Sequence, residues 1–67
     1  RTDAVLTERE VEVLGLVADG LTNGQIGTKL FMSPKTASVH VSHILAKLGA
    51  ANRTEAAATA RRQGLIG

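Results

Sequence analysis

Residues 22–48 read TNGQIGTKLFMSPKTASVHVSHILAKL and predict two helices joined by a very short turn. The first helix begins after Thr22, because Thr22 and Gln25 have the spacing of a capping box. In that arrangement the threonine hydroxyl accepts from the third helical N–H, and the glutamine side chain reaches back to the amide of the cap. We therefore expect a helix at about residues 23–30.

The second helix begins with Ser33 and Pro34, an N-cap followed by the one helical position where the missing N–H of proline costs nothing. Apolar residues at helical spacing extend this helix over residues 34–48, which leaves only Phe31 and Met32 as the connection. Two helices with so short a link form a helix-turn-helix. In that unit the second helix projects from the domain and can enter the major groove of DNA.

Packing roles are predicted for three residues of this unit. Gly27 is unfavourable inside a helix by about 1 kcal/mol relative to alanine. Its presence, with the small Ala37 on the second helix, predicts a close approach of the two helices. A tolerated weak position in a short helix would also explain Gly27. Phe31, the sole aromatic residue, is expected to plug the turn from the core side.

Further caps predict one helix on each side of this unit. Two more capping boxes are formed by Thr7 with Glu10 and by Asn52 with Glu55. The expected helices cover about residues 8–19 and 53–63. Glycines end three of the four helices, at Gly20, Gly49 and Gly64. Because no segment alternates with the period of a strand, the sequence predicts an all-α fold, a four-helix bundle that contains a helix-turn-helix.

Composition excludes several classes of protein. With 67 residues, 43% of them hydrophobic, the chain forms one domain with a small core. It has no cysteine for a disulfide, and two histidines are too few ligands for zinc. The sequence has no group of residues typical of a catalytic nucleophile and its base. It also has no apolar run of about 18 residues, the length that a membrane-spanning helix needs. We expect no catalytic residue, no cofactor, no metal, no small-molecule ligand, no membrane contact, and a soluble cytoplasmic protein.

Charge is distributed unevenly along the chain, whose net charge is +2. Residues 1–19 are acidic overall, whereas the segment from Gly20 to Thr54 has no acidic residue. The basic residues of this segment are Lys29, Lys35, Lys47 and Arg53. A folded surface with only basic charges is suited to a polyanion. A solvated basic surface without a partner is the alternative interpretation.

The predicted helix at 34–48 separates into two faces. Its core side carries Ala37, Val41, Ile44, Leu45 and Leu48, with His40 packing beside them. Its outer face carries Lys35, Ser38, Val39, Ser42 and Ala46. Serine hydroxyls can bond base edges, and valine can touch a thymine methyl group. Phosphate contacts are expected on the flanks, from Lys35, Thr36, His43, Lys47 and the helix N-termini. A plain surface helix would have similar residues.

Alanines give the last predicted helix a smooth face that another helix can approach closely. They are Ala56, Ala57, Ala58 and Ala60. We expect a twofold homodimer through Ala56, Ala57 and Ala60, which an isolated domain of this size forms only when bound to DNA. Packing of the same alanines within their own domain is the alternative.

Five motifs of the chain carry a family resemblance. They are LTEREVEVL, GLTNGQI, LFMSPKT, HVSHILAKLG and RTEAA, within about residues 6–65. Together they resemble the LuxR-type helix-turn-helix domain of response regulators of the NarL/FixJ group. The family usually has alanine and valine where this chain has Gly27 and Ala37, and we expect the smaller side chains to cost packing. Glu10 is expected to cap the first helix and to meet a nearby basic group.

The resemblance implies a sequence-specific double-stranded DNA-binding domain of a bacterial transcription regulator. By position, it implies base reading by Ser38, Val39 and Ser42. It implies phosphate binding by Thr22, Asn23, Lys35, Thr36, His43 and Lys47. The domain would occupy residues 1–67, as the C-terminal effector part of a longer regulator, and would bind an inverted repeat as a dimer. The start at Arg1 rather than methionine agrees with a piece of a longer protein.

A protein-interaction module is the competing hypothesis. A region resembling the promoter-recognition part of a sigma factor has the same helix-turn-helix geometry and would contact RNA polymerase. The two hypotheses differ in the expected response to salt, because only phosphate contacts release counterions on binding.

Overall fold

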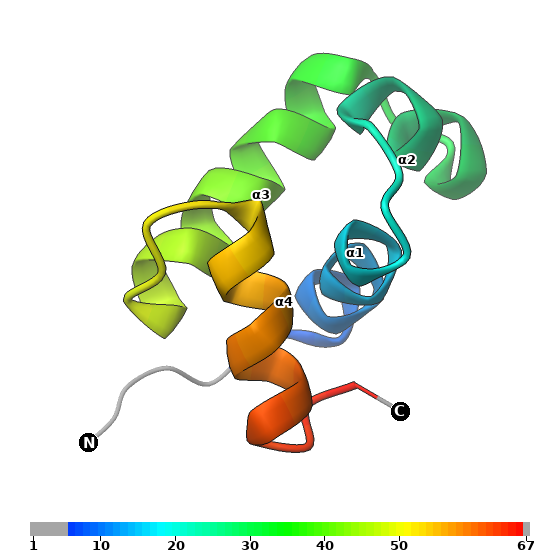
Figure 1. Cartoon of the computed structure of the whole chain (residues 1–67). Helices are drawn as coiled ribbons and strands as arrows, with labels where there is room; N and C mark the ends of the chain where they lie inside the picture. The colour runs from blue at the N-terminus through cyan, green and yellow to red at the C-terminus, as the bar shows by residue number, and fades with distance from the viewer. Residues whose placement is uncertain (1–5, 67) are drawn as a thin grey trace.

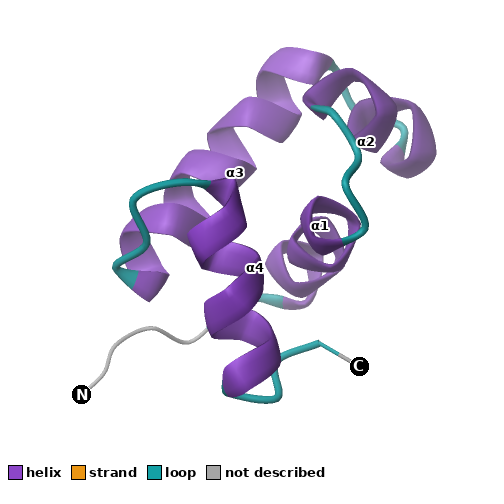
Figure 2. Ribbon diagram, viewed as in Figure 1, coloured by secondary structure: helices purple, strands orange, loops and turns teal. Residues whose placement is uncertain are grey.

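The computed structural model describes residues 6–66, which form four α-helices (Figures 1 and 2). These are α1 (Glu8–Ala18), α2 (Asn23–Leu30), α3 (Pro34–Leu48) and α4 (Arg53–Arg62). The described part of the chain contains no strand, so the predicted all-α fold is confirmed, with each helix end within one residue of its expected place. The longest helix, α3, packs against each of the other three helices.

Side-chain caps explain where α1, α2 and α3 begin. Both predicted capping boxes at the starts of α1 and α2 are present, with the hydroxyls of Thr7 and Thr22 accepting from the backbone N–H three residues later. Ser33 caps α3 in the same way, since its Oγ accepts from the Thr36 N–H at 3.1 Å. Each cap satisfies a donor that the helix itself leaves unpaired. The three predicted glycine stops, Gly20, Gly49 and Gly64, all have positive φ.

The cap of α4 differs in one respect from the prediction. Asn52 Oδ1 accepts from the Glu55 N–H at 2.9 Å, as a capping residue should. The Glu55 carboxylate, however, accepts from the N–H of Ala51 at 2.9 Å rather than from that of Asn52. With Asn52 extended, at φ −158° and ψ 176°, the carboxylate meets the amide one residue earlier.

The core lies where α1, α3 and α4 meet and extends to α2. Its fully buried large side chains are Val13, Leu14, Ile26 and Ile44. The predicted core side of α3 is confirmed, because Ala37, Val41 and Ile44 are buried and Leu45 and Leu48 pack against them. His40 is half-buried on the same helix.

Phe31 does not plug the turn, and the prediction of a core position for it is wrong. Its side chain is 96% exposed. Phe31 is the C-cap of α2 and has a left-handed backbone, with φ 60° and ψ 46°, while its N–H donates to the carbonyl of Gly27. This conformation directs the ring outward, and Met32 packs against the core instead. A left-handed residue other than glycine costs about 1–2 kcal/mol.

Close approach at Gly27 is confirmed, but the neighbour is the turn rather than a side chain of α3. A Cβ atom at this position would collide with the carbonyl oxygen of Met32 and lie 3.3 Å from the carbonyl carbon of Ser33. The amide of Met32 also donates to the Gly27 carbonyl at 2.8 Å. The expectation that glycine here costs packing is therefore wrong, because this backbone leaves no room for a larger residue.

Within residues 6–66, none of the helices has the length and apolar character needed to cross a membrane.

Candidate nucleic-acid interface

The outer face of α3 is the most coherent of the predicted sites. Its five predicted members, Lys35, Ser38, Val39, Ser42 and Ala46, are all exposed. Val39 keeps 46% of its surface in solvent. The opposite side of the helix is held by the core, so α3 is fixed while this face stays open. A rigid helix with a small-residue face can approach base edges closely, since no long side chain holds the backbone away.

Four of the residues predicted to bind phosphates lie at helix starts, Thr22 and Asn23 at α2 and Lys35 and Thr36 at α3. Lys35 and Thr36 lie in the first turn of α3 and are exposed, and His43 is exposed further along the helix. The Ser33 hydroxyl donates to the Thr36 hydroxyl at 3.0 Å, so the polar atoms at this N-terminus are ordered by one another. Neither helix has an acidic residue in its first turn, which leaves the partial positive charge of each N-terminus uncompensated.

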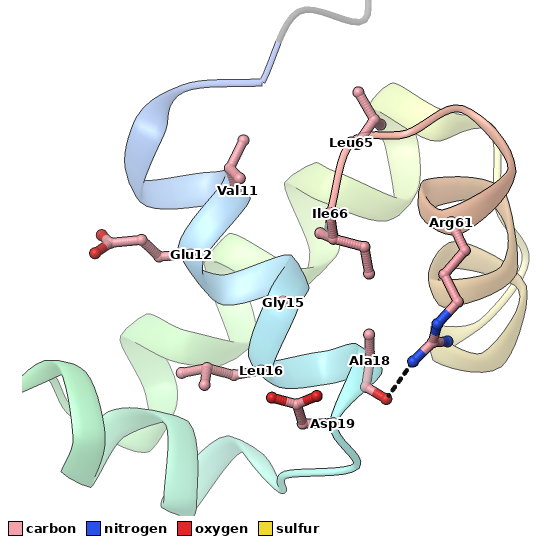
Figure 3. A pocket seen from close by; sticks show the side chains of 9 residues that line it. All are labelled: Val11, Glu12, Gly15, Leu16, Ala18, Asp19, Arg61, Leu65 and Ile66. Atoms are coloured by element: carbon pink, nitrogen blue, oxygen red, sulfur yellow. Dashed lines mark hydrogen bonds between the residues drawn. The ribbon is translucent and has the colours of Figure 1, made fainter.

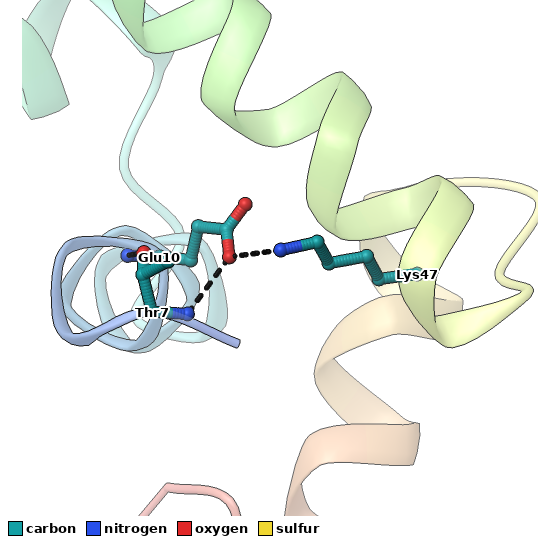
Figure 4. A network of polar contacts seen from close by, with 3 residues as sticks. All are labelled: Thr7, Glu10 and Lys47. Carbon is teal, nitrogen blue, oxygen red and sulfur yellow. Dashed lines mark hydrogen bonds and ion pairs between the residues drawn. The ribbon is translucent and has the colours of Figure 1, made fainter. Parts of the chain in front are cut away.

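Lys47 has a different place from the other predicted phosphate ligands (Figure 4). Its Nζ lies 2.7 Å from Oε1 of Glu10, and the same oxygen accepts from the Thr7 N–H at 2.8 Å. Glu10 is only 5% exposed. The hydrogen bond from Lys47, with that from the Thr7 amide, holds the pKa of the Glu10 carboxyl below its ordinary value. Lys47 thus joins α3 to α1, and the predicted basic partner of Glu10 is identified.

Arg53 is a positioning residue that sequence reasoning did not find. Its Nη1 donates to Asn23 Oδ1 at 2.5 Å, and its Nη2 donates to the carbonyl of Leu21 at 2.5 Å. The guanidinium therefore ties the start of α4 to the start of α2, where Asn23 was predicted to meet a phosphate. Because Arg53 belongs to the acid-free segment, its charge alone did not distinguish it from a phosphate ligand.

Loss of this tie should weaken both the fold and the interface. We expect Arg53→Ala to lower the free energy of unfolding by about 1–2 kcal/mol, because two bonds from a charged donor are lost. Affinity for duplex DNA should also fall, since the start of α2 is no longer held. Arg53→Lys is the matched control: it keeps the charge but cannot form the fork. Urea unfolding and DNA titration by fluorescence anisotropy measure both effects. Full DNA affinity in Arg53→Lys would show that only charge matters there.

The alanines predicted to form the dimer interface are buried in the protein's own core. Ala56 and Ala60 are 1% and 0% exposed, and Ala57 is buried beside them. The helix that carries them packs against α1. A second copy cannot reach these three residues, so this prediction is wrong. The exposed face of α4 carries Thr54, Glu55, Ala58, Arg61 and Arg62.

One hollow on the surface is formed by α1, the end of α4 and the residues that follow it (Figure 3). Its lining combines apolar side chains with Glu12, Asp19 and Arg61. Nη2 of Arg61 donates to the carbonyl of Ala18 at 3.2 Å, which helps close the C-terminal end of α1. The described residues contain no group of three His, Asp or Glu side chains that could hold a metal ion.

Comparison with protein families identifies one match. Residues 4–60 match the family described as bacterial regulatory proteins, luxR family. The chain is 48% identical over 61 residues to the transcriptional regulatory protein LiaR of Bacillus subtilis (strain 168), covering 91% of this chain and 29% of LiaR. It is 50% identical over 52 residues to the DNA-binding transcriptional activator DevR/DosR of Mycobacterium tuberculosis, covering 78% of this chain and 24% of that protein.

A solved structure shows the same arrangement of helices. The crystal structure of the response regulator ChrA, from a heme-sensing two-component system, superposes with a TM-score of 0.91 at 44% sequence identity. The match covers 98% of this chain and 33% of that one. This chain therefore spans about a third or less of these relatives, two of which are named as transcriptional regulators and the third as a response regulator.

Proposed function

Because the chain belongs to the luxR family of bacterial regulatory proteins, we propose that it is the effector domain of a response regulator and binds double-stranded DNA through α3. Members of this family use the helix-turn-helix for DNA-binding transcription regulation. The observation that best supports the choice of this surface concerns charge. The exposed face of α3 lies within a segment of 35 residues, Gly20–Thr54, that has no acidic residue.

Base reading is assigned to Ser38, Val39 and Ser42. They are exposed on one side of α3, and Val39 is the apolar member that can meet a thymine methyl group. The two hydroxyls can donate or accept, so they discriminate between bases less strongly than a bidentate side chain would. Much of the affinity then comes from the phosphate contacts that orient α3 in the groove.

Phosphate binding is assigned to Thr22, Asn23, Lys35, Thr36 and His43, together with the N-terminal amides of α2 and α3. Lys47 is less suited than these five, because a phosphate contact would compete with the ion pair to Glu10. Loss of that pair would leave the Glu10 carboxylate, which is 5% exposed, without its cationic partner. We therefore assign Lys47 to the fold.

The longer protein would act as a dimer on an inverted repeat. Since Ala56, Ala57 and Ala60 are buried, the contact between two copies would use the exposed side of α4. Arg61 and Arg62 outnumber Glu55 on that side, so their charge disfavours association of free copies, whereas DNA would hold two copies in register. Half-sites one helical turn apart would match such a pair. The same proposal has three further parts. The longer protein would have a sensor domain before this one, would act in the cytoplasm and would contact RNA polymerase.

The salt dependence of DNA binding tests the assignment. We expect the 67-residue chain to bind duplex DNA with an affinity that falls steeply with salt, by a slope of about −0.9 per phosphate contact. Lys35→Ala should reduce the magnitude of this slope by about 0.9 and weaken binding to all sequences alike. Val39→Ala should leave the slope unchanged and reduce the preference at one base pair by a factor of about 3 to 10.

Selection of sites from a random duplex pool supplies the sequences for these titrations. A flat response to salt would exclude the DNA-binding assignment. A change of sequence preference in Lys35→Ala, without one in Val39→Ala, would show that the two sides of α3 have been exchanged. Lys29→Ala is a matched control on α2, because it removes the same charge from a residue to which no phosphate is assigned.

A further inference from the structure

Phe31 combines two features that the free domain does not need. Its side chain is 96% exposed, and its backbone is left-handed at φ 60°. An exposed ring contributes no burial free energy to folding. A phenylalanine with a left-handed backbone is also more strained than the glycine or asparagine usually found at such helix ends. Both features oppose stability, so the reason for phenylalanine at this position has to lie in something it contacts from outside.

The turn holds the backbone that carries this ring in one conformation. The amides of Phe31 and Met32 both donate to the Gly27 carbonyl, and Gly27 sits directly against the Met32 carbonyl. Two residues later Ser33 caps α3. The backbone of Phe31 is therefore held in the short connection between α2 and α3, two residues before Pro34 opens α3 with Ser33 as its cap; Figure 2 shows this connection as a loop between the two helices. A contact made there would cost little ordering of the backbone.

Exposed apolar surface is concentrated on the helix-turn-helix. Within residues 6–66, the large hydrophobic side chains that are exposed are Phe31 and Val39. Both belong to the acid-free segment, and the exposed Lys29 and Lys35 flank Phe31 along the chain. Thr28, Ser33 and Thr36, all within five residues of Phe31 along the chain, are exposed as well. An apolar ring among amines and hydroxyls fits a polyanion that also has apolar carbon atoms on its surface.

We infer that Phe31 is a DNA contact, whose ring packs on the deoxyribose carbons of the strand that borders the major groove at the start of α3. This inference rests on the proposed function and adds to it an apolar contact that carries no charge. The basic surroundings disfavour a second copy of this chain, because two such tips would repel each other. They also disfavour a basic or neutral protein surface, since Lys35 would then have no counter-charge.

Binding and stability measured on the same variants test the inference. Phe31→Ala and Phe31→Asn should each weaken binding of the 67-residue chain to its selected duplex by about tenfold. The slope of log affinity against log salt should stay at the wild-type value, because no phosphate contact is removed. Phe31→Asn should also raise the urea midpoint of unfolding, since asparagine tolerates the left-handed backbone. Phe31→Leu should recover part of the affinity.

The outcomes separate this inference from the proposed function. Wild-type affinity in Phe31→Ala and Phe31→Asn, with salt-dependent binding by the parent chain, would overturn the contact alone. The same result with lost transcriptional activation in the longer regulator would also overturn it and would assign Phe31 to a protein partner. A reduced salt slope in the variants would mean a displaced turn and would overturn the ring contact. Failure of the parent chain to bind any duplex would overturn both proposals.

Discussion

Gly27→Val is expected to lower the free energy of unfolding by about 2–3 kcal/mol. The first added carbon already collides with the Met32 carbonyl oxygen, and the two methyl groups have to be placed beyond it. Backbone atoms cannot rotate away as a flexible side chain would, so the turn itself must move. Valine recovers only a few tenths of a kcal/mol through its better helix propensity. In a domain of this size the expected loss is a large part of the total stability.

Gly15→Ala is the control for Gly27→Val. Gly15 also lies inside a helix, but nothing is within 4 Å of a Cβ built there. Alanine should therefore raise the free energy of unfolding by up to about 1 kcal/mol. Urea unfolding followed by circular dichroism gives both values. Equal or greater stability in Gly27→Val would mean that the turn relaxes freely, and the close approach would then have no structural importance.

Local signals explain why the helix ends could be predicted so closely from the sequence. A cap acts within three residues of itself, as between Thr22 and Gln25, and a proline or glycine acts on its own backbone. Such interactions do not depend on the rest of the fold. The core side of α3 was predictable for a similar reason, because apolar spacing along one helix defines a face without reference to the neighbouring helices.

The intramolecular partners of long side chains were not predicted, because these partners lie far away along the chain. Lys47 meets Glu10 across 37 positions of sequence, and Arg53 meets Leu21 across 32. A lysine on the flank of a helix has the same sequence pattern whether it contacts a phosphate or a carboxylate. The absence of acids from Gly20 to Thr54 favoured the phosphate, since the partner of Lys47 lies outside that segment.

For the alanines of α4 and for Phe31, the sequence pattern alone does not determine whether the side chain is buried or exposed. The alanines of α4 make a smooth face, and smoothness suits a partner helix and the domain's own core equally well. For Phe31, hydrophobicity predicted burial, but the left-handed backbone at the end of α2 reversed the direction of the ring. The sequence has no glycine at that position to reveal the conformation, so the turn geometry was not predictable.

The second large effect on the free energy of unfolding is expected at the pair formed by Glu10 and Lys47. Glu10→Ala is expected to lower the free energy of unfolding by about 2–3 kcal/mol at neutral pH. The substitution removes the acceptor of the Thr7 amide and the partner of the Lys47 ammonium at once. Because the Lys47 side chain is 33% exposed, water can solvate its ammonium in part. The expected loss is therefore smaller than that for a fully buried pair.

Two further variants divide this effect into its parts. Glu10→Gln keeps an oxygen that can accept from the Thr7 amide but removes the charge, so it should cost roughly 1 kcal/mol less than Glu10→Ala. Glu12→Gln changes net charge equally at an exposed site, where Glu12 and Arg9 form a surface pair at 3.4 Å. It should change stability by less than about 1 kcal/mol. Equal effects of Glu10→Gln and Glu12→Gln would show that the buried pair adds nothing to the fold.

Acid should remove the same contribution in the parent chain. The pKa of Glu10 in the folded domain is lowered from its ordinary value of 4.5, chiefly by the Lys47 hydrogen bond and then by the Thr7 amide. A group with a lowered folded pKa stabilises the fold fully above the unfolded value, and this contribution is lost as pH falls through the folded value. Unfolding free energy measured from pH 7 to pH 3 should therefore decline below about pH 5. The decline should be smaller in Glu10→Gln, which has no proton to gain at this position. An equal decline in both proteins would assign the acid sensitivity to other carboxylates and would contradict the role given to Glu10.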